Sequence, residues 1–215
     1  MSDLKKIVSP VGELWYTNIS GQGKKNYNED GYVYASTIHL TGADALSFKA
    51  EIDAILGPVP KGKMIKSTGC RELLEDAEGR YTPTKKTAER DKGAKPTGIF
   101  AFGFSTNVVY SDGRIKKVNV YNASAQKVDM GDRLIGNGSK GAISGAAQRY
   151  ESKDEVGVSL FLNAVQLTEY VAYEGNAGFG KQEGGFSAPT DGETGFAGKP
   201  EEVVDPQTAT VKPRL

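Results

Sequence analysis

The 215-residue chain is poor in the side chains that most often ligate metals or act in catalysis. Cys70 is its one cysteine and His39 its one histidine. A lone cysteine permits no internal disulfide, which favours a reducing compartment, and no zinc site is expected because Cys70 and His39 stand far apart in the sequence. A Ser-His-Asp triad would depend on His39, which lies in no recognisable nucleophile motif. We therefore expect no metal, no cofactor and no enzymatic activity, and we interpret His39 as an ordinary strand residue.

Long apolar runs and an excess of charge of either sign are also missing. No stretch approaches the ~18 apolar residues of a membrane span, and residues 1–12 lack the apolar core of a signal peptide. We therefore expect a cytoplasmic protein that contacts no membrane. Basic and acidic residues both total 27, so the net charge predicts no polyanionic partner. Their distribution is uneven, because residues 174–215 carry a net charge of −3 and residues 1–173 a net charge of +3.

Composition divides the chain after Tyr173. Residues 174–215 are rich in glycine, proline and threonine and have no hydrophobic periodicity, which is typical of a flexible segment. We predict a folded domain over residues 1–173 and a flexible, mildly acidic tail over residues 174–215. Within the domain, residues 57–97 carry ten basic and six acidic residues. This stretch is predicted to be a long basic insertion with one short helix in residues 70–78.

Alternating apolar residues predict a mainly β domain. Residues 31–40 alternate as a strand does, and residues 41–56 follow with the spacing of a helix capped by Thr41. Residues 99–110 place Phe100, Phe102 and Phe104 on one face, which we assign to the core. A turn at residues 111–113 is expected to return the chain as a strand over residues 114–123.

A glycine-rich segment, "GNGSKG" at residues 136–141, formally matches the G-x-G-x-x-G pattern of dinucleotide-binding loops. Walker A spacing is absent, and the residues that follow have the character of a strand rather than of a phosphate-binding helix. We interpret the segment as a turn that begins a long hairpin, with strands over residues 134–150 and 156–173. The apolar alternation slips by one residue between Leu162 and Val165, which predicts a β-bulge.

Basic and aromatic residues are interleaved in three segments, around residues 15–34, 110–121 and 140–150. Proteins that bind single-stranded nucleic acid use this combination, because cations neutralise phosphates and flat rings stack on bases. Aromatic residues on strands are otherwise core residues, which leaves a structural role open for each ring; for Tyr150 we expect exposure. The candidate nucleic-acid-binding residues are Trp15, Tyr16, Lys24, Lys25, Tyr27, Arg114, Lys116, Lys117, Tyr121, Lys140, Arg149 and Tyr150.

The order of these features resembles the OB-fold single-stranded DNA-binding proteins that tailed phages encode for replication. The resemblance is most specific in "LIGNGSKGAISGAAQRY" followed by "VGVSLFLNAVQLTEY", within residues 134–170. It implies an all-β fold, a five-stranded Greek-key barrel with one or two helices. It also implies Tyr150 as a base-stacking residue and Lys140 as the lysine of the turn.

The resemblance further implies sequence-independent coating of single-stranded DNA in phage replication or recombination, in the cytoplasm of the host cell. Replication proteins contacted through the tail, and self-association, are the further partners that it suggests. Two departures stand out: the tail is only mildly acidic and ends in "KPRL", and Asp30 occupies a place where some members have arginine. A virion-associated β-domain without nucleic-acid binding is the alternative, and a nucleotide hydrolase is the third hypothesis.

Overall fold

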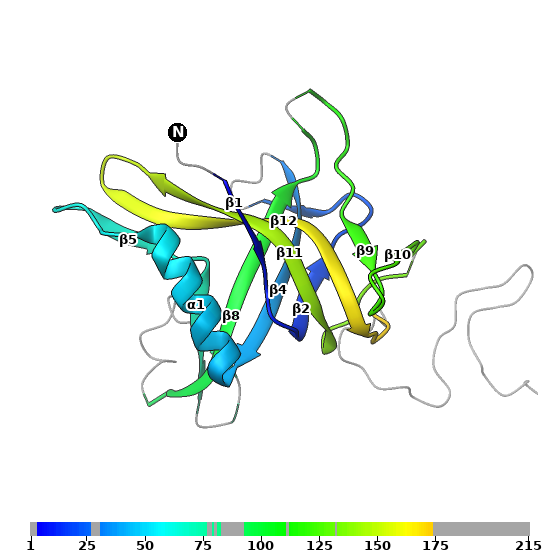
Figure 1. Cartoon of the computed structure of the whole chain (residues 1–215), viewed down its shortest axis with the longest axis horizontal. Helices are drawn as coiled ribbons and strands as arrows, with labels where there is room; N and C mark the ends of the chain where they lie inside the picture. Colours follow the sequence, from blue (N-terminus) through cyan, green and yellow to red (C-terminus); the bar gives the residue numbers. More distant parts are fainter. Residues whose placement is uncertain are drawn as a thin grey trace, which may run out of the picture. The chain divides into compact units, whose positions relative to one another are not determined.

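The computed structural model describes residues 4–26, 31–76, 79, 81–82, 93–110, 112–131 and 133–173 (Figure 1). These residues form strands around a single long helix, α1 (Gly42–Leu56). None of the helices in this part of the chain is long and apolar enough to cross a membrane. The strands are β1 (Lys5–Val8), β2 (Gly12–Asn18), β3 (Lys24–Lys25), β4 (Tyr32–Thr41), β5 (Met64–Ser67), β6 (Cys70–Glu75), β7 (Tyr81–Thr82), β8 (Lys95–Asn107), β9 (Asn119–Tyr121), β10 (Lys127–Val128), β11 (Ser139–Glu151) and β12 (Glu155–Glu169).

Five strands close into a barrel in the order β2-β4-β8-β12-β11, with β11 returning to β2. All of the neighbouring pairs are antiparallel except β8 and β12, which run parallel where Ser105 lies beside Phe161. A parallel contact between the third and fifth strands is the arrangement of the Greek-key OB barrel. The predicted fold class is therefore confirmed, and the helix is inserted between the second and third barrel strands.

The core follows the alternation that the sequence predicts. Ile38 and Leu40 of β4 face inward with Phe102 and Phe104 of β8, and all four are buried. The helix covers part of this core, since Phe48 packs edge-on against Phe102 with ring centroids 4.9 Å apart. Burying a side chain of this size contributes roughly 1.5–3 kcal/mol.

The glycine-rich segment before β11 is a turn, as predicted. Gly138 has a φ of 86°, which glycine adopts without strain, and its N–H donates to the Leu14 carbonyl of β2. The buried Ser139 hydroxyl donates to the Gly136 carbonyl at 2.8 Å. A strand follows instead of a helix, so the segment lacks the setting of a dinucleotide-binding loop.

The predicted bulge in the β11–β12 hairpin is also present. The pairing register shifts between Ser144 and Gly145, where Asn163 becomes the extra residue of β12. A Cβ at Gly145 would collide with the Phe161 carbonyl oxygen of β12 and would lie 3.1 Å from the Phe104 ring. The strand can therefore approach the core closely only because this position carries no side chain.

The region between Gly57 and Thr97 differs from the prediction. Residues 70–75 form strand β6, so the predicted helix over residues 70–78 is wrong. Strand β6 pairs with β8, whose outer edge would otherwise leave backbone groups without partners. This pairing overrides the local helix propensity of "CRELLE". Residues 77–78, 80 and 83–92 lie outside the described residues, as does the predicted tail over residues 174–215.

The strand predicted over residues 114–123 is shorter than expected. Only Asn119–Tyr121 forms a strand, β9, which runs parallel to β12. The residues before it belong to a hairpin closed by a single bridge between Val109 and Ile115. This hairpin projects from the barrel as the green loop at the top of Figure 1.

Candidate nucleic-acid interface

Strands β2, β4 and β8 present an outer face with small side chains at its centre. Because Ile38 and Leu40 point inward, Thr37 and Ala35 occupy the opposite side of β4. The register places Thr37 beside Gly103 and Ala35 beside Ser105. A Cβ at Gly103 would meet no atom within 4 Å. Gly103 and Ser105 are exposed, Thr37 is half-buried and Ala35 is buried beside them. We call this part of the surface the floor (Thr37, Gly103 and Ser105), and it is open to a flat ligand. In OB folds, the face of the second and third strands is the usual oligonucleotide-binding surface.

An aromatic pair flanks the floor. Trp15 of β2 lies opposite Thr37, and its indole stacks on the His39 imidazole with centroids 5.2 Å apart and planes 16° apart. Partial burial lowers the pKa of His39, and the nearby Arg71 lowers it further, while Glu13 opposes the shift. At neutral pH the imidazole is therefore uncharged. The two stacked rings therefore form an uncharged aromatic surface beside the floor.

A β-bulge directs Tyr16 outward beside this pair. Tyr16 and Thr17 of β2 together oppose the single residue Ser36 of β4. Tyr16 has a φ of 53°, and 63% of the residue is exposed. Left-handed backbone costs a non-glycine residue roughly 1–2 kcal/mol, so this ring is held outside the core at the expense of stability. Its centroid lies 6.2 Å from that of Trp15.

The glycine-rich turn supports Tyr16 and places Lys140 nearby. The Asn137 side-chain oxygen accepts the Tyr16 backbone N–H at 2.8 Å. Lys140 lies opposite Glu13 on β2, and with Trp15 and His39 it lines a cavity of about 350 Å³. Its ammonium group is paired with Glu169 at 3.0 Å. The structure thus brings three predicted residues, Trp15, Tyr16 and Lys140, to one region.

A second group of predicted residues gathers at the opposite end of β4. Lys24 of β3 pairs with Val33, which in turn pairs with Asn107 at the end of β8. Two strand spacings, about 10 Å, therefore separate Lys24 from the start of the projecting loop. We call this loop the basic hairpin (residues 108–110 and 112–116). Lys24 and Lys25 are both exposed.

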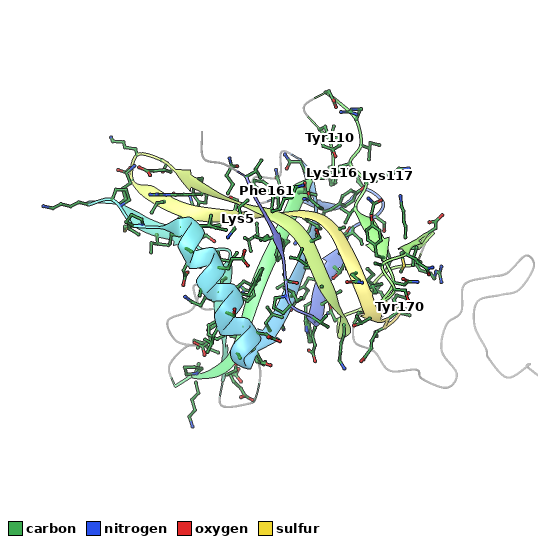
Figure 2. The ribbon with its side chains drawn as sticks, in the orientation of Figure 1. Lys5, Tyr110, Lys116, Lys117, Phe161 and Tyr170 are labelled. Atoms are coloured by element: carbon green, nitrogen blue, oxygen red, sulfur yellow. The ribbon has the colours of Figure 1, made fainter. Side chains whose placement is uncertain are left out.

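The basic hairpin combines an exposed ring with two cations. The Arg114 guanidinium and the Lys116 ammonium lie 5.5 Å and 5.7 Å from the centroid of Tyr110. Figure 2 shows Tyr110 on the hairpin with Lys116 and Lys117 below it. Arg114 also pairs with Asp112, and its hydrogen bonds hold the pKa of that carboxyl below the ordinary value. Cations beside an aromatic face are attracted by its quadrupole.

Lys116 differs from the other lysines of the hairpin region because it is partly buried. Its ammonium group donates to the Thr106 hydroxyl at 2.6 Å. Burial lowers the pKa of Lys116, since the ammonium loses part of its hydration. Lys117, the next residue, is exposed. A phosphate beside Lys116 would compensate the lost hydration with a charge-assisted hydrogen bond.

Arg149 and Tyr150 lie far from both groups. Arg149 follows Lys140 by nine positions in β11, which corresponds to about 30 Å along a strand. Arg149 donates to the Pro58 carbonyl beyond the end of α1 and pairs with Glu151. These contacts give Arg149 a structural role at the end of the helix. Tyr150, the next residue of β11, points to the opposite face of the strand.

Tyr150 is half-buried, so the expectation that it is exposed is wrong. It pairs with Gly157, and its phenol lies where a Cβ of that glycine would be. The Tyr150 ring packs over β12 because Gly157 has no side chain to exclude it. Tyr121 is likewise half-buried on β9, and Tyr27 lies outside the described residues. Base stacking by these three tyrosines stays a prediction.

Sequence reasoning missed several residues of the face and one of the basic hairpin. His39 was interpreted as an ordinary strand residue, and Tyr110 was left out of the candidate set. The exposed Arg71 of β6 lies opposite Ala101, which pairs with His39 on the other side. Phe161 of β12 lies beside Ser105 at the edge of the floor. Alternation indicates which side of a strand these residues occupy, but their proximity depends on strand register between distant segments.

Comparison with known proteins found similar folds among solved structures of phage single-stranded DNA-binding proteins. No protein-family model and no curated protein sequence matches the chain. The crystal structure of gp2.5, a single-stranded DNA-binding protein encoded by bacteriophage T7, aligns with a TM-score of 0.53 and 17% identity, over 87% of this chain and 100% of that one. The fold expected from the sequence resemblance is thereby confirmed.

The single-stranded DNA-binding protein from bacteriophage Enc34 is also similar. Its C-terminal truncation aligns with a TM-score of 0.47 and 11% identity, over 76% of this chain and 85% of that one. The same protein in complex with ssDNA aligns with a TM-score of 0.45 and 13% identity, over 76% and 86%.

Proposed function

We propose that the protein binds single-stranded DNA, without sequence preference, on the outer face of β2, β4 and β8. One observation carries the proposal: Trp15 and Tyr16 stand side by side at the edge of a floor of small residues. The fold shared with gp2.5 of bacteriophage T7, a single-stranded DNA-binding protein, supports it. An exposed aromatic ring held in left-handed backbone lowers stability, so a ligand contact is the best account of its position.

In this mechanism the bases stack and the phosphates are neutralised. Bases lie over the floor and stack on Trp15 and Tyr16, at about 1–3 kcal/mol per base. Lys24, Lys25, Lys116 and Lys117 neutralise phosphates where the strand passes the basic hairpin. Stacking accepts every base because each has a π-face. Duplex DNA keeps its bases stacked on one another and cannot use the aromatic residues, so single strands are preferred.

We infer the biological role from the resemblance to phage single-stranded DNA-binding proteins. The protein would coat and protect single strands during phage replication or recombination in the host cytoplasm, without catalysis. Residues 1–173 would form the binding domain, and the tail over residues 174–215 would contact replication proteins. Self-association along a coated strand belongs to the same proposal. Tyr27, Tyr121, Lys140, Arg149 and Tyr150 remain predicted contacts, with Lys140 closest to the aromatic residues.

A binding comparison at two salt concentrations tests the function. Labelled single-stranded and duplex oligonucleotides of equal length are titrated with the full chain at low and at high salt. We expect tighter binding of the single strand and a steep loss of affinity with salt, because each neutralised phosphate releases counterions. Equal affinity for both forms would refute the proposal. No binding to either form would favour the virion-associated β-domain.

A further inference from the structure

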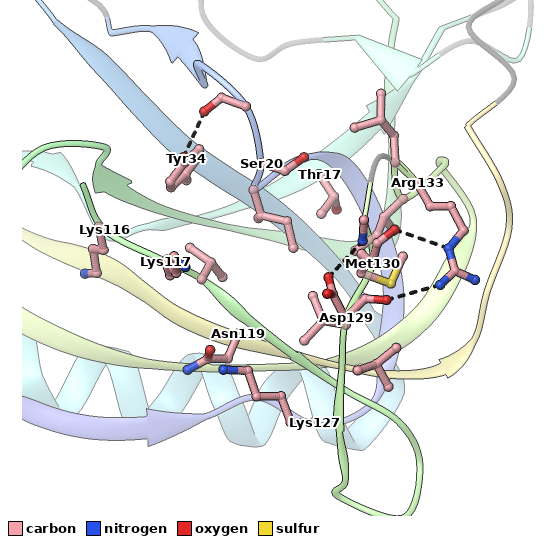
Figure 3. A pocket seen from close by; sticks show the side chains of 18 of the residues that line it. Thr17, Ser20, Tyr34, Lys116, Lys117, Asn119, Lys127, Asp129, Met130 and Arg133 are labelled. Atoms are coloured by element: carbon pink, nitrogen blue, oxygen red, sulfur yellow. Dashed lines mark hydrogen bonds between the residues drawn. The ribbon is translucent and has the colours of Figure 1, made fainter.

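A second cavity, which we call the cradle, opens beside the end of β2 (Figure 3). It has a volume of about 600 Å³ and is bounded by residues 17, 19–21, 115–120, 127–131 and 133–135, with Tyr34. Its apolar lining includes Ile19, Val118, Val120 and Met130. Cavities of this size and polarity commonly hold small molecules or parts of polymers.

The rim of the cradle is basic. Lys116, Lys117, Lys127 and Arg133 line it, and Asp129 is the one carboxylate among its described lining residues. Within the described ranges, none of the four cations forms an ion pair with a carboxylate. Many basic residues elsewhere are paired, as Lys5 is with Glu51. A group of unpaired cations around an apolar cavity produces a field that attracts an anion.

Arg133 is already oriented for such an anion. Its Nε donates to the Met130 carbonyl at 3.2 Å and one terminal nitrogen donates to the Asp129 carbonyl at 3.1 Å, as Figure 3 shows. A guanidinium has five N–H donors. The rest are not used by any group in the described part of the chain. A phosphate could accept them in the bidentate geometry that arginine favours.

The cradle also adjoins the proposed binding face. Thr17 lines it and directly follows the exposed Tyr16 in the bulge. Only two residues of chain, at most about 7 Å, lead from Trp15 to Thr17. Lys116 belongs to both the basic hairpin and the rim of the cradle.

We propose that the cradle is a further nucleotide subsite of the same strand, an inference that rests on the proposed function. The base enters the apolar part against Val120 and Met130, while Lys127 and Arg133 hold its phosphate. The strand therefore turns over the bulge at Tyr16 instead of ending there. The cradle lengthens the site without adding sequence preference, because its lining combines aliphatic contacts with charge.

The dependence of affinity on oligonucleotide length distinguishes the contribution of the cradle from that of the face of β2, β4 and β8. The full-length protein is titrated with labelled single strands of about 4 to about 16 nucleotides, the range of OB-fold site sizes. The cradle variant is Lys127→Ala with Arg133→Ala. Its matched control is Lys6→Ala with Lys153→Ala. Both lysines are exposed; Lys6 lies in β1 and Lys153 in the turn between β11 and β12. Both variants remove the same charge.

The cradle variant should bind the longest strand at least about 10-fold more weakly than the control and the shortest strand equally well. Its log–log salt dependence on the long strand should fall by about 1.4, since each lost contact to a single strand removes about 0.7. The exposed single change Lys127→Glu should reproduce the length dependence without disturbing the backbone contacts of Arg133.

Three outcomes would overturn the subsite while leaving the proposed function intact. In the first, the cradle variant and the control bind single strands of every length with equal affinity. In the second, the cradle variant loses the same affinity at every length. In the third, it loses affinity for a free deoxynucleoside monophosphate but none for long strands. The last result would assign the cradle to a free nucleotide. Failure of the unmodified protein to bind single strands of any length would instead refute the proposed function.

Discussion

The Trp15 indole and the His39 imidazole stack across β2 and β4, with ring centroids 5.2 Å apart and planes 16° apart. The two residues come from neighbouring strands of a closed barrel, so the barrel itself determines the orientation of the indole. A ring that is already ordered loses less conformational entropy when a ligand binds. We therefore regard Trp15 as the preorganised centre of the proposed interface.

Replacing Trp15 measures the contribution of stacking. Trp15→Ala should weaken binding of single-stranded DNA by about 1–3 kcal/mol, the value of one stacked base. Trp15→Phe should retain part of this energy because a smaller ring remains. Fluorescence anisotropy with a labelled oligonucleotide gives both affinities, and urea unfolding shows whether the barrel is intact. A folded Trp15→Ala protein with unchanged affinity would remove stacking from the mechanism.

Tyr16 should show opposite effects on stability and on binding. Glycine adopts a φ of 53° without strain, so Tyr16→Gly should raise the free energy of unfolding by about 1 kcal/mol. The same change removes a stacking ring and should weaken binding. Tyr16→Ala serves as the control, since it loses the ring but keeps the backbone strain. A stabilised variant that binds normally would contradict the proposed role of Tyr16.

The floor can be blocked without disturbing the core. Gly103→Leu introduces a side chain whose Cβ meets no atom within 4 Å, so unfolding should change by no more than about 0.5 kcal/mol. The leucine should nevertheless exclude bases from the floor and reduce affinity at least about 10-fold. Ser144→Leu, at an exposed position of β11, is the matched control. Equal affinities of the two variants would place the bound strand elsewhere on the barrel.

His39 should make stability dependent on pH. Its pKa is lowered in the folded protein, chiefly by burial, so the unfolded chain takes up the proton more readily. The free energy of unfolding should therefore decrease as the pH falls through about 6.5, the ordinary histidine pKa. His39→Phe preserves a ring against Trp15 and should abolish this part of the dependence. Urea unfolding at about pH 7.5 and about pH 5.5 measures this dependence. The same pH dependence in the unmodified protein and in His39→Phe would contradict its assignment to His39.

Much of the barrel could be predicted because one face of each strand is buried. Period-2 alternation identified β4 and the inward phenylalanines of β8, and the slipped alternation identified the bulge in β12. The strand β6 could not be recognised, because its identity depends on pairing with β8 rather than on its own residues. Alternation also places Arg149 and Tyr150 on opposite faces, and applying it would have separated them at the outset.

The site was less accessible to prediction than the fold. Interleaved rings and cations suggested Trp15, Tyr16 and the lysines near the hairpin as contacts, and that assignment stays a prediction. The stacking of Trp15 on His39 requires the register of two strands that are distant in sequence. The outward direction of Tyr16 requires a bulge that no local pattern marks. Such features arise from tertiary pairing, which a single sequence does not specify residue by residue.

The fluorescence of Trp15 tests the central claim most directly, because it is the only tryptophan of the chain. The unmodified protein is titrated with single-stranded DNA under excitation selective for tryptophan. We predict saturable quenching, as bases stack on the indole, which reverses when salt is added and is much weaker with duplex DNA. Unchanged emission under conditions where an independent assay shows bound single strands would contradict the account.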